Sequence, residues 1–171
     1  MEEIYLHFLK TIDKIINRIY NIEFQAEESN VSFEDVDFDS WYYEDVYAAL
    51  ENGYINGYET KTTVKDANGV ITENVVHEFK PDQPITRQEA ARIIARVDSG
   101  KDIEDNNKDT KTDFADDKDI ATWADESVQY LKDKRISIGY EEDLEMVFKP
   151  NNKLSRAEAL VMLLRAIRLE K

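Results

Sequence analysis

One stretch of this sequence occurs twice, and it limits what the chain can fold into more than any other feature. A Phe-Lys-Pro triplet at Phe79–Pro81 precedes Pro84–Ala90, and the same triplet at Phe148–Pro150 precedes the related segment Lys153–Ala159. In both copies the Phe lies eight residues before the first Arg of the segment. The chain therefore contains two copies of one structural unit.

Each copy predicts a helix that begins at a capping box. A Ser or Thr three residues before a Glu, followed by an apolar run, is the sequence signature of such a start. The capping residues are Thr86, Glu89, Ser155 and Glu158. We expect helices over about 86–97 and 155–169, with Ala90, Ile93, Ile94 and Val97 inward in the first and Leu160, Leu163, Leu164 and Ile167 inward in the second.

An Arg occupies the first turn of both predicted helices, at Arg87 and Arg156. A helix start has free backbone N–H groups and a partial positive charge, so it favours acidic side chains over basic ones. An Arg there lacks a simple stability reason, and with the free N–H groups it can hold an anion. The alternative is that each Arg pairs with an acidic neighbour, of which this chain has many.

The match between the copies continues upstream. Phe33 and Asp35 precede Trp41, Phe114 and Asp116 precede Trp123, and a Gly-Tyr pair follows each Trp after sixteen residues, at Gly57-Tyr58 and Gly139-Tyr140. In this order the anchors resemble the S-layer homology repeat, with its Phe-x-Asp, Trp, Gly-Ile-x-x-Gly, Phe-x-Pro and Ile-Thr-Arg-Ala-Glu motifs. The resemblance covers roughly residues 31–171.

The resemblance implies a mainly α fold. Proteins of this family commonly carry three repeats about a pseudo-threefold axis, with the helices after the Thr-Arg-Ala-Glu signature forming a central bundle. Only two repeats are present here, but residues 1–26 have apolar residues every three or four positions, as in an amphipathic helix. We therefore expect residues 1–30 to form a helix and linker, with the helix in the third bundle position, followed by repeats at 31–100 and 101–171.

Within each repeat the pattern predicts a second helix, at about 41–52 and 123–134. Asp39 or Ser40 is expected to cap the first of these, and Gly53 to end it. The second copy has Arg135 in place of that Gly, so either its helix ends differently or its site is altered. Residues 59–78 are rich in β-branched residues around Asp66–Gly69, which predicts a β-hairpin inserted in the first repeat. The shorter loop of the second copy is expected to form only a turn.

For function, the resemblance implies non-covalent attachment to the bacterial cell surface. Such repeats bind secondary cell-wall polysaccharides, often with pyruvylated amino sugars, in grooves between neighbouring repeats. The motif matches place the candidate ligand residues at Asp35, Trp41, Gly57, Tyr58 and Arg87 in the first copy, and at Asp116, Trp123, Gly139, Tyr140 and Arg156 in the second.

Each residue type suits that chemistry. Arg87 offers forked donors to a pyruvyl carboxylate, the aspartates accept hydrogen bonds from hydroxyls, and aromatic rings lie against pyranose faces. The glycines let the backbone approach a sugar closely. The alternatives are that Trp41 and Trp123 are core anchors, that the aspartates only cap turns, and that the Gly-Tyr pairs only serve turns.

The charge balance excludes several other functions. A net charge of −15 argues against binding nucleic acid or an anionic membrane surface, and no segment reaches the apolar length of a membrane span. Without Cys there is no thiol nucleophile and no cysteine metal site, and we expect no cofactor. Asp105, Asn107 and Asp109, followed by Asp113 and Asp116, resemble a calcium loop. Thr110 stands where that loop needs Gly and Asp116 where it prefers Glu, so a solvated acidic linker is favoured over a metal site.

Three further interpretations follow. The fold can serve as a protein-interaction or structural module that has lost glycan binding, with the hairpin as its contact surface. Glu89 and Glu158 could be imagined as the carboxylate pair of a glycosidase. Both are expected to cap helices, and they lie in separate repeats, so we expect the chain not to be an enzyme. The acidic start at Glu2 and Glu3 is unlike a signal peptide, and we expect this chain to be part of a larger extracellular surface protein.

Overall fold

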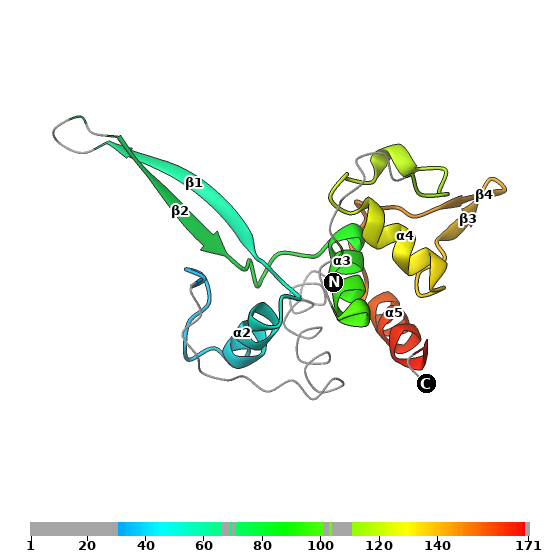
Figure 1. Ribbon diagram of the computed structural model, residues 1–171, viewed down its shortest axis with the longest axis horizontal. Coiled ribbons are helices and arrows are strands. Elements are labelled where there is room, and N and C mark those ends of the chain that lie inside the picture. Colours follow the sequence, from blue (N-terminus) through cyan, green and yellow to red (C-terminus); the bar gives the residue numbers. More distant parts are fainter. Residues whose placement is uncertain (1–30, 66–68, 70, 101–102, 104–110, 170–171) are drawn as a thin grey trace. The chain divides into compact units, whose positions relative to one another are not determined.

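A computed structural model (Figure 1) describes residues 31–65, 69, 71–100, 103 and 111–169. These residues form two compact units, and the boundary between them in the sequence lies between Gln83 and Pro84. The boundary falls inside the first sequence copy, so the signature helix of that copy belongs to the unit that holds the second copy. The predicted N-terminal helix at 1–26 and the acidic segment 104–110 lie outside the described residues.

In the unit that ends at Gln83, helix α2 (Tyr43–Glu51) packs its buried Val46–Ala49 face into a core with Phe33 and Phe79. The Phe33 ring lies 5.8 Å from the Tyr47 ring and 5.9 Å from the Phe79 ring. The predicted cap at Asp39 or Ser40 is wrong. Tyr42 occupies the N-cap and makes no side-chain capping hydrogen bond, because residues 37–40 form a turn, closed by the Ser40 N–H and the Asp37 carbonyl, and the helix begins only after it.

The helix α2 ends as predicted, at a glycine. Gly53 has φ 71°, its N–H donates to the Leu50 carbonyl at 2.9 Å, and the Tyr54 N–H donates to the Ala49 carbonyl at 2.9 Å. This pair of bonds is a Schellman motif, in which the left-handed residue favours Gly because it has no Cβ.

The second copy ends its helix in the same way, although it has Arg at the corresponding position. In α4 (Asp125–Asp133) the Arg135 N–H donates to Lys132 and the Ile136 N–H donates to Leu131, both at 2.8 Å. Arg135 has φ 55°, so the backbone keeps the motif despite the side chain. Of the two alternatives given for Arg135, a different helix end is therefore wrong.

The hairpin of the first copy is confirmed. Strands β1 (Tyr58–Lys65) and β2 (Ile71–Glu78) pair antiparallel from Tyr58↔Glu78 to Lys65↔Ile71, and form a long exposed ribbon (Figure 1).

The expectation of only a turn in the second copy is wrong, because β3 (Tyr140–Glu142) and β4 (Glu145–Val147) form a short hairpin. Asp143 and Leu144 connect them with φ 49° and 68°. Two positive φ values give the two-residue type I′ connection, which needs little length.

The unit that begins at Pro84 contains the two signature helices, α3 (Arg87–Ser99) and α5 (Arg156–Leu169), together with α4, β3, β4 and a 3₁₀ turn η2 (Asp117–Asp119). Helix α3 packs against α4 and α5. The most deeply buried side chains include Ile94, Val128, Leu131, Ile136, Phe148 and Leu163. In the described part of the chain, more residues lie in helices than in strands, and no helix is long and apolar enough to cross a membrane.

The inward face of α5 differs from the prediction at two positions. Leu163 is buried with Ala159, Met162 and Ala166, whereas Leu160 and Leu164 are 46% and 41% exposed. A run that is apolar on nearly every side does not reveal which side meets its neighbours, since several faces fit the 3.6-residue period. Val161 is also exposed, so one apolar side of α5 faces outward.

The strained end of α4 gives a stability prediction. A non-glycine residue in the left-handed region costs roughly 1–2 kcal/mol, part of which glycine loses again through its flexible unfolded state. We expect Arg135→Gly to raise the free energy of unfolding by about 0.5–1 kcal/mol in urea denaturation. Lys134→Gly, one residue earlier and inside the helical region, should instead lower it; equal effects would contradict the strain argument.

Candidate functional site

A carboxylate clamp holds the Phe-Lys-Pro turn in each copy. Asp116 accepts the Phe148 N–H through one oxygen and the Lys149 N–H through the other, both at 2.7 Å. In the first copy Asp35 makes the same two bonds to Phe79 and Lys80, at 2.8 and 2.7 Å. The aspartates therefore have the turn-holding role that was the alternative to ligand binding, and their contact with a sugar stays a prediction.

The glycines of the Gly-Tyr pairs are required by packing. Gly139 has φ 78°, and a Cβ there would lie 2.6 Å from both the Phe114 ring and the Val147 carbonyl oxygen. Gly57, with φ 68°, has the same surroundings in Phe33 and Glu78. The protein's own phenylalanine makes the close approach at both positions, and a close approach by a sugar stays a prediction.

Arg87 of α3 is brought together with the second copy. Its Nη1 donates to the Tyr140 hydroxyl at 2.6 Å and to Glu158 Oε1 at 3.1 Å, and its Nη2 donates to Ser137 Oγ at 3.3 Å. The guanidinium carbon also lies 4.6 Å from the Tyr140 ring centre and 5.3 Å from that of Phe148. The Tyr140 hydroxyl donates to Glu158 in turn. The alternative that this Arg pairs with an acidic neighbour is therefore confirmed for Arg87, although the sequence did not reveal that the neighbour is Glu158.

The Arg87 side chain is buried, with the residue only 7% exposed. Burial lowers the pKa of its guanidinium from the ordinary value, the nearby Glu158 carboxylate opposes that shift, and Arg165 adds to it. Among the residues that the structure describes, no acceptor meets the Arg87 Nε–H. A buried donor without an acceptor costs about 1–3 kcal/mol, which offsets part of the stability that the other contacts of Arg87 provide.

The backbone amides at the start of α3 are already used. The Arg87 N–H donates to the Asn152 carbonyl at 2.9 Å, the Gln88 N–H donates to the Pro150 carbonyl at 3.1 Å, and the Glu89 N–H donates to Thr86 Oγ1 at 3.4 Å. The expectation that these amides are free to bind an anion is therefore wrong for α3. The turn of the second copy occupies the place where an anion would lie.

The predicted capping residues are confirmed. Thr86 accepts from the Glu89 N–H, and the Glu89 carboxylate accepts from the Thr86 N–H at 2.7 Å. Ser155 and Glu158 make the matching pair at the start of α5, at 3.3 and 2.9 Å. The two carboxylate oxygens of Glu158 have different partners: Oε2 accepts from the Ser155 N–H of the cap, and Oε1 accepts from Arg87. The side chain of Arg156 lies outside the described part of the structure.

A lysine lies over the tyrosine of each Gly-Tyr pair. Lys149 Nζ is 5.2 Å from the Tyr140 ring centre, and Lys80 Nζ is 4.6 Å from that of Tyr58. Arg87 and Lys149 therefore both make cation–π contacts with Tyr140. Each also pairs with a glutamate, Arg87 with Glu158 at 3.1 Å and Lys149 with Glu142 at 2.5 Å.

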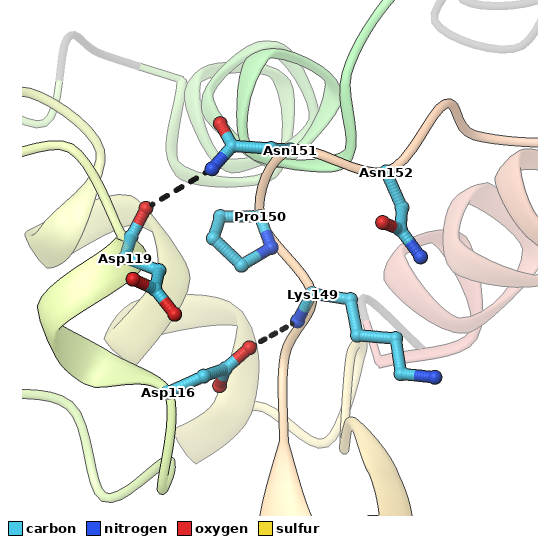
Figure 2. Close-up of a pocket in the computed structure, with 6 residues that line it drawn as sticks. All are labelled: Asp116, Asp119, Lys149, Pro150, Asn151 and Asn152. Carbon is cyan, nitrogen blue, oxygen red and sulfur yellow. Dashed lines mark hydrogen bonds between the residues drawn. The ribbon is translucent and has the colours of Figure 1, made fainter.

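The second copy also has an open pocket of about 360 Å³, within the range of small-molecule sites, and Lys149 is one of its lining residues. Figure 2 shows the Pro150 ring in the middle, with Asp116 and Asp119 on one side and Asn152 on the other. Asn151 closes the rim by donating to the Asp119 carbonyl at 3.5 Å. Carboxylates and amides around a small apolar floor suit sugar hydroxyls.

The two tryptophans are not core anchors. Trp41 is 54% exposed and Trp123 is 41% exposed, so neither residue is buried. Arg92 of α3 donates to the Trp123 carbonyl at 2.5 Å, and its guanidinium carbon lies 5.8 Å from the ring centre. Stacking of either ring on a sugar stays a prediction.

Several residues of this region were missed. Ser137 and Asn151 have no equivalents in the motif, and Gln88 stands where the family has Ala. Gln88 donates to Asn151 at 3.0 Å and accepts the Ala121 N–H at 2.9 Å, which ties the start of α3 to two loops. The lysines Lys80 and Lys149 were detectable, because both copies have Lys between Phe and Pro.

Within the described residues no group of three or more His, Asp or Glu side chains is placed to hold a metal ion. Asp113, which was part of the calcium-like pattern, pairs with Lys132 at 3.1 Å, and Asp116 is occupied by the turn. The other residues of that pattern lie outside the described part.

Comparison with known proteins defines the class. The sequence model of the S-layer homology domain matches residues 32–91 and 113–160, more than half of the chain. The chain belongs to the S-layer homology domain family, with two copies of the repeat.

The chain is also similar to a particular surface protein. It is 28% identical over 146 residues to the Surface-layer 125 kDa protein of Lysinibacillus sphaericus. The match covers 85% of this chain but only 10% of that relative's length.

The clamp leads to a second stability prediction. In Asp116→Asn an amide nitrogen replaces one oxygen, and it cannot accept from the N–H of Phe148 or Lys149. We expect the free energy of unfolding to fall by about 1–3 kcal/mol in urea denaturation. Asp119→Asn removes the same charge from an exposed side chain nearby and should change stability little; equal losses would argue against the clamp.

Proposed function

We propose that this chain attaches a larger protein to the bacterial cell surface by binding an anionic secondary cell-wall polysaccharide, of the pyruvylated kind. Membership of the S-layer homology family supports anchoring at the cell surface in general. The similarity to a surface-layer protein, of which the chain spans a tenth, supports a module within a longer surface protein.

The observation that carries the proposal is the pair of cations at Tyr140. The whole chain has a net charge of −15, so an anionic polymer is repelled unless it meets local positive groups. Arg87 and Lys149 supply them at one aromatic ring, and the Arg87 Nε–H has no acceptor among the described residues.

The polar pocket of the second copy extends the proposed site. Lys149 belongs to both, since its backbone lines the pocket and its ammonium lies over Tyr140. A sugar bearing an acidic group could thus place the acid near the cations and its hydroxyls near Asp119 and Asn151. We propose the same role for the first copy at Tyr58 and Lys80. The exposed Trp41 of the first copy and the exposed Trp123 of the second are proposed to stack on sugars, each within its own copy.

Binding to purified walls tests the function. The chain should co-sediment with walls that retain the secondary polymer and not with walls from which it has been extracted. Calorimetric titration with polymer fragments should show binding that weakens by about 1.5–3 kcal/mol when the pyruvyl groups are removed, because a charge-assisted contact is lost. A folded chain that binds neither form would contradict the proposal.

That negative result would favour the second candidate, a protein-interaction module. The β1–β2 hairpin supports this candidate, since Ile71 and Val75 on β2 are 67% and 49% exposed. Shortening the hairpin to the length of β3–β4 distinguishes the two, because polymer binding should survive the change and a protein contact through the ribbon should not.

We also propose the three-helix arrangement of the family, with residues 1–26 beside the signature helices. The outward apolar side of α5, formed by Leu160, Val161 and Leu164, supports a further helix there. The chain has no Cys of its own, so two introduced cysteines can form an intramolecular disulfide only with each other. We expect Leu164→Cys to form a disulfide with a cysteine at Ile12, Ile15 or Ile19, and not with one at Lys14; failure at all three apolar positions would contradict this arrangement.

A further inference from the structure

The lysine of the Phe-Lys-Pro turn has an unusual backbone in both copies. Lys80 has φ 58° and Lys149 has φ 61°, in the left-handed region that favours Gly. A following Pro normally drives the preceding residue to extended conformations, so the position is restricted twice. The clamps of Asp35 and Asp116 hold the strained turns. Backbone strain that recurs in both copies with the same side chain indicates a functional role for that side chain.

The ammonium groups of these lysines are placed alike. Each lies over the tyrosine of its Gly-Tyr pair, and each meets a glutamate of the adjacent hairpin, Glu78 at 3.8 Å and Glu142 at 2.5 Å. In the second copy the Lys149 side chain leaves the pocket on the side away from the two aspartates (Figure 2). The ammonium is therefore presented at the ring and not neutralised by the pocket carboxylates.

The two ion pairs are exchangeable. The Lys149 and Glu142 side chains are 30% and 52% exposed, and those of Lys80 and Glu78 are 33% and 35% exposed. Pairs with this much water contact contribute little to stability, so a ligand anion can replace the glutamate at small cost. Arg87 differs, because it is 7% exposed and Glu158, Tyr140 and Ser137 hold it.

We propose that Lys149 and Lys80 are the residues that directly contact the anionic substituent of the polymer, which displaces Glu142 and Glu78 from them. Arg87 then adds positive charge from within the protein and keeps Tyr140 in place. The inference rests on the proposed function and assigns its anion contact to residues outside the signature helix. The shared chemistry is a carboxylate or phosphate oxygen on a glycan.

The test compares lysine variants in calorimetric titrations with wall-polymer fragments, in the full chain. Lys149→Met and Lys80→Met keep the length of the side chain and remove its charge, and each should weaken binding roughly tenfold at the site it serves. Lys134→Met is the matched control, because Lys134 Nζ also lies over a tyrosine, at 5.7 Å from the Tyr130 ring centre, but at the end of α4. It should bind as the unaltered chain does.

Two measurements separate binding from folding. Lys149→Gly relieves the left-handed strain, so it should keep or raise the melting temperature while weakening binding as Lys149→Met does. In the unaltered chain, acetylation followed by mass spectrometry should show Lys149 and Lys80 protected by the polymer and Lys134 not protected. Neither result is expected if the lysines only support the fold.

The outcomes distinguish this inference from the proposed function. If the unaltered chain binds the polymer and the double variant Lys80→Met/Lys149→Met binds it equally well, the lysine assignment is overturned and the anchoring function stands. If the unaltered chain does not bind, both fail. A lysine effect that disappears with depyruvylated polymer supports the assignment and identifies the ketal carboxylate; one that persists supports it with a phosphate or another anion as the contact.

Discussion

The rest of the second copy depends on two hydrogen bonds to one carboxylate. Asp116 fixes the backbone of Lys149 in a conformation that it would not otherwise hold. The turn then presents the carbonyls of Pro150 and Asn152 to the first N–H groups of α3, and so positions Arg87. A single acidic side chain thus determines where a strand ends, where a helix of the other copy begins, and where two cations stand. This explains why the same aspartate recurs in both copies.

The chain combines a strongly acidic surface with a few positive groups at defined places. General attraction would bring an anionic polymer to any basic patch, whereas here a polymer gains only where its charge matches a cation held against an aromatic ring. Repulsion elsewhere weakens nonspecific contacts more than specific ones, because only the specific ones have compensating partners. An acidic protein is therefore well suited to selective recognition of another acidic molecule.

Several local signals in the sequence gave correct predictions, whereas contacts between residues far apart in the chain could not be predicted. The capping boxes, the end of α2 at Gly53 and the long hairpin follow from neighbours in the chain. The partners of Arg87 lie 53 and 71 residues further on, and no spacing rule reveals them. The outward side of α5 likewise depends on which helices surround it. The short β3–β4 hairpin was missed because Leu144 takes a positive φ at a turn position where Gly is expected, although Asp143 before it suits the turn.

The two hairpins are one element at two lengths. Tyr58↔Glu78 and Tyr140↔Val147 are equivalent pairs at the base, but the ladder continues for eight pairs in the first copy and three in the second. When residues are added beyond the base as cross-strand pairs, the side chains at the base still point to the same faces of the ribbon, since side chains alternate along each strand. Evolution can therefore lengthen this ribbon freely, and an engineer could graft a peptide at its tip for display while the tyrosine and lysine below keep their geometry.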